Sequence, residues 1–201
     1  MLRKLKEQWE QLEYEVFLAE NKESAKEIVK SLIKKDESIS LGGSVTLDQL
    51  ELVKTFRDEG FNLYDRYAEL TDAERTECFK RGLTADWLVM SSNAITEKGE
   101  IINVDGTGNR VAPLIYGTQN VLIIVGKNKV VSDVSAGLER IRRVAPLNAK
   151  RLKRATPCVV DGVCHNCNSK ERICNMTSII HNGYRFPKRI KIILVNEDLG
   201  Y

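Results

Sequence analysis

The stretch that decides the fold is residues 86–117, which reads DWLVMSSNAITEKGEIINVDGTGNRVAPLIYG. It begins with a short apolar run at 87–90, which is typical of a strand buried on both faces of a parallel sheet. A polar turn at 91–93 follows, then a second short strand at 101–104 and a glycine loop at 105–110 that leads into a helix. In α/β folds, this order of elements places ligand-binding groups at the carboxyl edge of the sheet.

The glycines give the loop at 105–110 its potential to bind a ligand. Gly106 and Gly108 permit positive φ angles and let the backbone approach a bound group closely. The amide groups of such a loop are able to hold an anion at the start of the helix predicted for residues 111–116. Because the dipeptides D-G and T-G also form ordinary turns, the loop alone does not establish a site.

The composition fits one globular domain. Of the 201 residues, 42% are hydrophobic and 29% are charged, and the formal net charge is +3. This charge is too small to argue for nucleic acid as a partner. No apolar run is long enough to span a membrane, and charged residues interrupt the N-terminal stretch, unlike in a signal peptide. We therefore expect a cytoplasmic protein that binds neither membranes nor nucleic acid.

Along the rest of the chain, predicted strands alternate with predicted helices. We expect helices at 2–18, 22–35, 46–57, 71–82 and 132–144. We expect further strands at 38–41, 61–64, 121–125 and 190–195. Because this alternation is typical of βαβ units, we predict a single α/β domain over residues 1–201, with a three-layer, Rossmann-like and mostly parallel sheet.

Residues 1–20 are predicted to form an N-terminal helical arm. Leu2, Leu5, Trp9, Leu12 and Val16 recur at a spacing of three and four residues among polar side chains, which is the pattern of an amphipathic helix. Such an apolar stripe packs either on its own domain or on a second subunit. A homodimer is therefore one of the arrangements that we expect.

A second glycine-containing loop follows the strand predicted at 38–41. Gly42, Gly43 and Ser44 stand between that strand and the helix predicted at 46–57, which is where α/β folds bind phosphate or carboxylate groups. A tight turn that binds nothing has the same sequence pattern. Both interpretations stay open at this point.

Four of the five cysteines lie in a short segment, residues 156–176, with the spacing C-x5-C-x2-C-x6-C: Cys158, Cys164, Cys167 and Cys174. Four thiolates this close in sequence can ligate zinc or hold a [4Fe–4S] cluster. Structural zinc sites usually have two Cys-x2-Cys pairs, whereas here the outer cysteines stand singly, which favours iron–sulfur over zinc. Four reduced cysteines without a metal are the third interpretation, and Cys78 is expected to be a buried, inert thiol.

Several separated motifs occur in an order that is found in one protein family. They are LGGS at 41–44, NAITEKGEIINVDGTGNRVA at 93–112, YG at 116–117, VGKNK at 125–129, APLNAKRL at 145–152 and TPC…GVCHNC…RIC at 156–174. Over essentially its whole length, the chain therefore resembles the LUD-domain (DUF162) family of lactate-utilisation proteins. The resemblance implies a NagB/RpiA/CoA-transferase-like fold, with a ligand cleft between the LGGS loop and the loops at 93–110.

The resemblance also implies the residues that line this cleft: Gly42, Gly43, Ser44, Asn93, Asp105, Gly106, Thr107, Gly108, Asn109 and Arg110. More remotely, residues 86–110 resemble sugar-phosphate isomerases, which carry an acidic residue where Asn93 aligns. Since asparagine does not titrate, Asp105 and Glu97 are the carboxylates left to move a proton, if burial raises their pKa. The fork of Arg110 suits a carboxylate or phosphate group.

Three functions from different classes remain open, and the sequence identifies no reaction. The first, favoured by the resemblance, is an accessory subunit with an iron–sulfur cluster, which works with iron–sulfur partner proteins to oxidise L-lactate or a similar hydroxy acid. The second is a metabolite-binding or isomerase-like protein with structural zinc, whose ligand is a sugar phosphate or nucleotide. The third, a basic module that docks on nucleic acid through residues 140–154, is the weakest because the net charge is nearly neutral.

Overall fold

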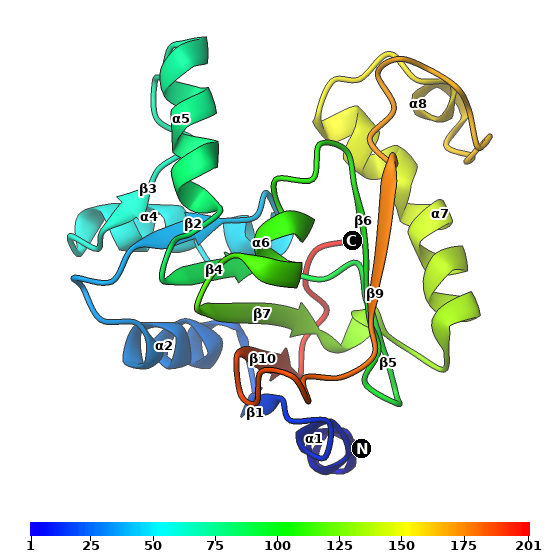
Figure 1. The fold of residues 1–201 in the computed structure, drawn as a ribbon. Coiled ribbons are helices and arrows are strands. Elements are labelled where there is room, and N and C mark those ends of the chain that lie inside the picture. The colour runs from blue at the N-terminus through cyan, green and yellow to red at the C-terminus, as the bar shows by residue number, and fades with distance from the viewer.

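The main sheet confirms the predicted α/β fold. A computed structural model describes residues 1–201 (Figure 1). Six strands lie in the order β1-β10-β7-β4-β2-β3, and every neighbouring pair is parallel. These strands are β1 (Glu15–Ala19), β2 (Ile39–Leu41), β3 (Leu63–Tyr64), β4 (Trp87–Met90), β7 (Asn120–Gly126) and β10 (Ile190–Val195).

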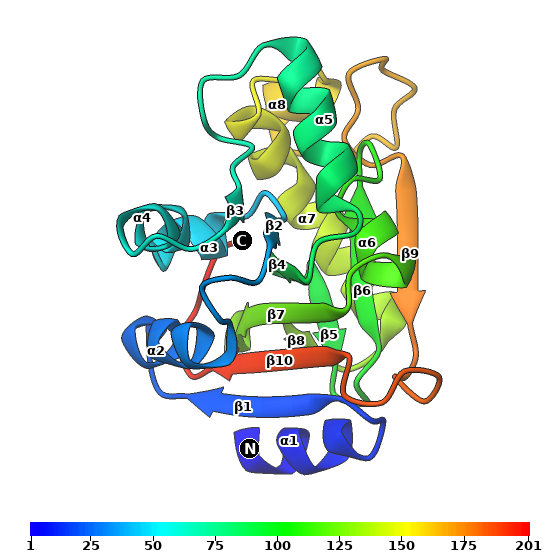
Figure 2. The same ribbon diagram turned by 60° about the vertical axis from the view of Figure 1, so that its left-hand side comes forward.

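Helices and a second sheet cover the two faces of the main sheet (Figure 2). Alternate residues of β7 point to opposite faces, so Leu122 and Ile124 join one buried cluster while Val121 and Ile123 join the other. The first cluster includes side chains of α2 (Lys22–Leu32), α3 (Val45–Gln49) and α4 (Leu52–Asp58). The second includes α1 (Leu2–Glu10) and α6 (Val111–Tyr116). This arrangement gives the three layers that the sequence predicts.

The second sheet has four strands in the order β8-β5-β6-β9. They are β5 (Ala94–Thr96), β6 (Ile101–Asp105), β8 (Val130–Val131) and β9 (Met176–Ile180). The long helix α7 (Val134–Arg151) packs on this sheet through Ile141, which contacts the cluster of Ala94 and Ile102. Of these strands only β6 was predicted, because β5 and β8 are too short to show a period and β9 depends on its antiparallel pairing with β6.

The prediction of one helix over residues 2–18 is wrong. Helix α1 ends at Glu10, Glu13 has a φ of 63°, and residues 15–19 form the edge strand β1, which pairs with β10. Val16 fits the helical spacing. However, the run Glu15–Ala19 pairs with β10, which lies far away in the sequence, and this pairing decides its conformation. Leu5 and Trp9 are buried against the chain's own domain, so the apolar stripe of the arm is already covered.

Further predicted boundaries differ from the structure, and helix α2 ends at Leu32 rather than at residue 35. The helix expected at 46–57 is two helices, α3 and α4, because Glu51 adopts a left-handed conformation with φ 53°. Helix α7 begins after Asp133, whose side chain accepts a hydrogen bond from the N–H of Ala136, and it continues past residue 144 to Arg151. The remaining helices are α5 (Asp72–Gly82), as predicted, and α8 (Pro157–Asp161). None of the helices is both long and apolar enough to cross a bilayer.

Candidate functional site

Four loops meet where the parallel strands of the main sheet end. Strand β2 leads into Gly42–Ser44, β4 into Ser91–Asn93, β7 into the 3-10 turn η1 (Lys127–Lys129) and β10 into residues 196–201. Because all the strands are parallel, their carboxyl ends share one edge, which is the usual position of ligand sites in α/β sheets. The glycine loop at 105–110 reaches this edge from β6, and its Arg110 binds the loop that follows β4.

Arg110 joins these loops. Its Nε donates to Asp105 Oδ2 (3.3 Å), and its two NH groups donate to the backbone oxygen of Ser91 (3.2 Å), to Asn93 Oδ1 (3.0 Å) and to the backbone oxygen of Val104 (2.7 Å). A guanidinium group has five N–H donors, so the protein already engages four of them. The structure therefore uses Arg110 mainly to hold the cleft together, and it leaves one N–H for a ligand.

Asp105 is held in its ionised form. Its carboxylate accepts hydrogen bonds from the backbone N–H groups of Thr107 (3.1 Å) and Gly108 (3.0 Å), as well as from Arg110. Burial alone would raise the pKa of Asp105, but the charge of Arg110 and the two N–H groups outweigh burial, and the pKa is lowered. This disfavours Asp105 as a general acid and gives it a role in shaping the glycine loop, where Gly108 has a φ of 86°.

The structure does not bring Glu97 to the cleft. Glu97 is exposed and lies in the turn between β5 and β6, at the end of this hairpin opposite Asp105. Its backbone oxygen accepts a hydrogen bond from the indole N–H of Trp9 (3.1 Å), on helix α1. The two carboxylates that the sequence offered for proton transfer are therefore far apart in the fold.

Gly42 and Gly43 play different parts in the cleft. A Cβ atom at Gly42 would lie 2.9 Å from the Cβ of Met90 and 3.0 Å from the Cδ of Arg110, so only glycine lets Arg110 lie against this loop. A Cβ atom at Gly43 would meet nothing closer than 3.5 Å. Ser44 accepts a hydrogen bond from the N–H of Thr46 (3.2 Å) and so caps α3.

Two predicted residues lie at the tip of the glycine loop. The Thr107 side chain donates to Asn109 Oδ1 (2.5 Å), and Thr107 is exposed. Asn93, after β4, is tied to the same loop, because its Oδ1 also accepts from the N–H of Val104 (2.9 Å). The structure thus brings the residues predicted to line the cleft to one edge of the main sheet, whereas Glu97, which was predicted only as a proton-transfer group, lies elsewhere.

Sequence reasoning missed Lys129. Its side chain is buried, with 5% of the residue exposed, and its Nζ donates to the hydroxyl oxygens of Thr46 (2.8 Å) and Ser91 (2.9 Å). Burial, together with the charges of Arg140 and Arg110, lowers the pKa of Lys129 from 10.5 to about 7. No signal in the motif VGKNK separates Lys129 from Lys127, which is exposed.

The four clustered cysteines line one hollow beside the glycine loop. His165 and Arg172 also line it, and all four thiols are free and partly exposed. Between the cysteines the chain turns sharply through Gly162 (φ 78°) and Asn166 (φ 45°). No group of three or more Cys, His, Asp or Glu side chains is gathered closely enough to form a metal-ligand set. The structure thus brings the predicted ligands to one pocket without arranging them as a finished site.

Arg172 gives this pocket a positive charge and a free N–H donor, both of which suit an anionic metal centre. It donates to the backbone oxygens of Cys167 and Cys174, and so links the Cys-x2-Cys pair to the last cysteine. Its Nε is buried and has no hydrogen-bond partner. A centre bound by four thiolates carries net negative charge, which this unpaired donor would stabilise. The donor set and Arg172 therefore fit either zinc or an iron–sulfur cluster.

The cysteine pocket and the cleft are in direct contact. Asn175, which follows Cys174, donates its backbone N–H to the oxygen of Asp105 (2.9 Å) and its side-chain Nδ2 to the oxygen of Gly106 (2.9 Å). A Cβ atom at Gly106 would lie 3.4 Å from the backbone of Ile173. The segment that bears the cysteines is therefore packed on the glycine loop at the sheet edge.

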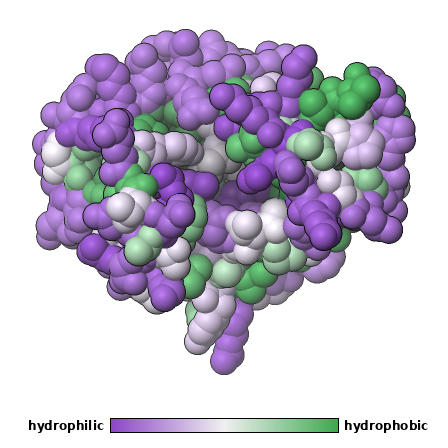
Figure 3. Space-filling view, turned by 90° about the horizontal axis from the view of Figure 1, so that it is seen from above, coloured by the Kyte–Doolittle hydropathy of each residue, from purple (hydrophilic) through white to green (hydrophobic).

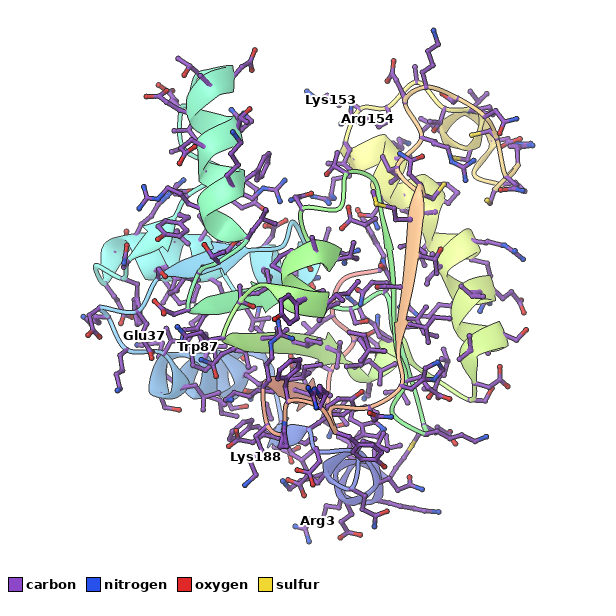
Figure 4. The ribbon with its side chains drawn as sticks, viewed as in Figure 1. Arg3, Glu37, Trp87, Lys153, Arg154 and Lys188 are labelled. Carbon is purple, nitrogen blue, oxygen red and sulfur yellow. The ribbon has the colours of Figure 1, made fainter.

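Two basic residues and two exposed valines lie near the cysteine pocket. Lys153 and Arg154 lie at the end of α7, next to the segment that leads to α8 (Figure 4). Seen from above, hydrophobic side chains gather on the side where α8 lies (Figure 3). In this region Val160 is 89% exposed and Val163 is 59% exposed. The cysteine pocket therefore has a rim that carries both basic and apolar side chains.

Comparison with known proteins places the chain in a family. The model of the LUD domain family matches residues 2–195. The crystal structure of a DUF162 family protein from Deinococcus radiodurans aligns with a TM-score of 0.53 at 15% sequence identity, covering 97% of this chain and 96% of that one. At this identity the likeness speaks for the fold alone. No curated protein matches the sequence. Because the family model covers nearly the whole sequence, the chain belongs to the LUD domain family.

Proposed function

We propose that this protein is an accessory redox subunit with an iron–sulfur cluster, acting in the oxidation of L-lactate or a similar small hydroxy acid. The LUD domain family is associated with lactate utilisation. The observation that carries the proposal is the contact between the four-cysteine pocket and the glycine loop through Asn175. This contact would set an electron-carrying group beside the edge of the sheet where small molecules bind.

The cysteines would hold the cluster as thiolates: Cys158, Cys164, Cys167 and Cys174. When bound, the cluster supplies one-electron transfer. Arg172 would stabilise the negative charge of the centre through its buried Nε, and it already fixes the backbone at Cys167 and Cys174. The protein's own residues thus position the ligands and balance their charge.

The electron balance of the proposed reaction requires partners. Oxidation of a hydroxy acid to a 2-oxo acid releases two electrons and two protons, whereas a cluster carries one electron at a time. We therefore expect iron–sulfur partner proteins to accept the electrons in two successive transfers. The basic rim formed in part by Lys153 and Arg154 favours a partner with an acidic docking surface.

The test compares metal content and colour across three proteins purified without oxygen: the wild type, Cys174→Ser and Cys78→Ser. Cys78 lies on α5, outside the pocket, and serves as the matched control. We expect about four irons per chain and a broad visible band in the wild type and in Cys78→Ser, and loss of both in Cys174→Ser. One zinc per wild-type chain with no colour would contradict the proposal.

A second candidate is a metabolite-binding protein whose cysteines hold structural zinc. The ordered polar cluster around Arg110 favours it, because these groups are already in place at the sheet edge. Binding is better supported than isomerisation, since Asp105 is held ionised and Asn93 does not titrate. Zinc content together with stabilisation by sugar phosphates or nucleotides would support this candidate.

A further inference from the structure

Lys129 is a buried lysine without a carboxylate partner. Its Nζ bonds only to the hydroxyl groups of Thr46 and Ser91, and the ion pairs of the structure do not include it. A charged ammonium group is costly to bury unless it is paired. A buried, unpaired lysine is therefore a candidate for a role in ligand binding or in a reaction.

Two more buried cations contact the same polar turn after β4. Ser91 accepts from Lys129 through its hydroxyl and from Arg110 through its backbone oxygen. Asn93 accepts from Arg110 through Oδ1 and from Arg140 through its backbone oxygen (2.8 Å). Asp105, bound to Arg110, is the one carboxylate hydrogen-bonded to these cations. The cluster therefore has more positive than negative groups, which favours an anionic ligand.

Hydrogen-bond donors next to Lys129 remain free. An ammonium group has three N–H donors, and Lys129 uses two of them. The Thr46 hydroxyl accepts from Lys129, and no acceptor lies within hydrogen-bond distance of its own proton. The Ser91 hydroxyl reaches only the oxygen of Ser92, at 3.4 Å. These donors lie next to one another, because the Nζ of Lys129 is within 2.9 Å of both hydroxyl oxygens, so one anionic group with several oxygens would be able to accept from all three side chains.

Residues 199–201 cover this point. A Cβ atom at Gly200 would lie 2.6 Å from the Thr46 hydroxyl and 3.0 Å from the Nζ of Lys129, and Gly200 has a φ of 65°. Glycine is therefore the residue that lets the backbone lie directly over the lysine. Two hydrogen bonds hold this cover, from the N–H of Leu199 to Asn128 (3.1 Å) and from the N–H of Gly200 to Gln49 (2.7 Å).

We propose that Lys129 anchors an oxyanion site beneath residues 199–201, completed by the hydroxyl groups of Thr46 and Ser91. The ligand is a small metabolite that carries a carboxylate or phosphate group, and residues 199–201 move aside to admit it. Arg110 and Arg140 hold the turn in place, because Arg110 donates four hydrogen bonds and Arg140 two, all to protein oxygens. The site contains no cysteine, so it does not rest on the redox function proposed above.

Binding of an anion at Lys129 is coupled to the uptake of a proton by the lysine. Burial is the main cause that lowers the pKa of the free lysine to about 7, and the charges of Arg140 and Arg110 add to this effect, while the carboxylate of Asp105 is bound to Arg110. A bound anion favours the charged ammonium form, so binding takes up a proton. Because the lysine of the free protein loses its proton above pH 7, affinity is expected to fall about tenfold between pH 6 and pH 8.

The test measures thermal stability and binding heat with sodium acetate, sodium pyruvate and inorganic phosphate, at constant ionic strength. We expect at least one of these anions to raise the Tm of the wild type. The pH dependence given above applies to acetate and pyruvate, because phosphate itself titrates in this pH range. Lys129→Met should abolish the shift, whereas Lys127→Met, which changes an exposed lysine two residues away, should keep it. The carboxylate and phosphate arms identify which group the site prefers.

A second variant keeps the test decisive if Lys129→Met folds poorly. Thr46→Val leaves the lysine in place and removes one hydroxyl donor, so it should weaken anion binding while the pH dependence persists. No shift with any of the three anions in the wild type, or an undiminished shift in Lys129→Met, would overturn the proposal.

Discussion

The polar cluster around Arg110 and the four-cysteine pocket are neighbours, yet the protein satisfies them to very different degrees. Arg110 has acceptors for four of its donors, and Asp105 accepts three hydrogen bonds. In the pocket, the thiols are free and partly exposed, and Arg172 keeps a buried donor unpaired. The first region is organised by the chain alone, whereas we propose that the second takes its final form around a metal centre.

The largest expected effect comes from breaking the organised region. Arg110→Ala removes the donors to Ser91, Asn93 and Val104 and leaves the carboxylate of Asp105 buried without its partner. We expect a loss of about 3–5 kcal/mol in the free energy of unfolding, measured with urea.

Arg142→Ala is the control for that experiment, because Arg142 is exposed on α7. It should change the unfolding free energy by no more than about 0.5 kcal/mol. If the two variants were equally stable, the hydrogen bonds of Arg110 would not organise the cleft.

The pH dependence of stability tests the buried lysine of the same region. The folded-state pKa of Lys129 is about 7, below its unfolded value of 10.5, so between these values the unfolded chain binds more protons. Stability should therefore rise as the pH increases from 7 towards 9, with a contribution from Lys129 of about 2 kcal/mol.

Urea unfolding of the wild type and of Lys129→Met at pH 7, 8 and 9 isolates this contribution, since other titrating groups are common to both proteins. The curve of the variant should be flatter than that of the wild type by that amount. Parallel curves would mean that the lysine titrates normally in the folded protein.

The smallest effect is expected in the cysteine pocket. In protein prepared with a strong chelator, Cys167→Ser should change the unfolding free energy by no more than about 1 kcal/mol, because the thiol is partly exposed. In protein loaded with iron and sulfide the same change should cost far more, since a bound centre contributes its binding energy to folding. Equal effects in both preparations would mean that the chain alone organises the cysteine pocket, without a metal centre.

The sequence predicts the main sheet and its loops best where the pattern lies within one short stretch of the chain. The runs at residues 87–90 and 121–125 are apolar throughout, which identified two central strands, and Gly42 and Gly108 stand where the backbone needs glycine. Strand β1 escaped prediction because its conformation depends on pairing with β10 in a distant part of the chain. Strand β9 escaped for the same reason, and with it the contact between the cysteines and the glycine loop.

The site was predicted to the extent that its residues are neighbours in sequence. The four cysteines could be grouped from spacing alone, and the structure gathers them in one pocket. Lys129 could not be found in this way, because its partner Thr46 lies on α3 and its partner Ser91 lies on the loop after β4. Whether a lysine after a strand is exposed or buried depends on what packs over it, and here Gly200 does so.

Hydrogen–deuterium exchange of residues 156–175, measured with and without iron and sulfide, shows whether a metal centre organises the cysteine pocket. We expect the amides of this segment to exchange fast in chelator-treated protein. Loading with iron and sulfide should slow their exchange by at least about tenfold, while exchange in β4 and β7 stays unchanged. Exchange of the segment that is as slow as that of β7 before loading, or that does not change on loading, would contradict the claim that a metal centre organises the cysteine pocket.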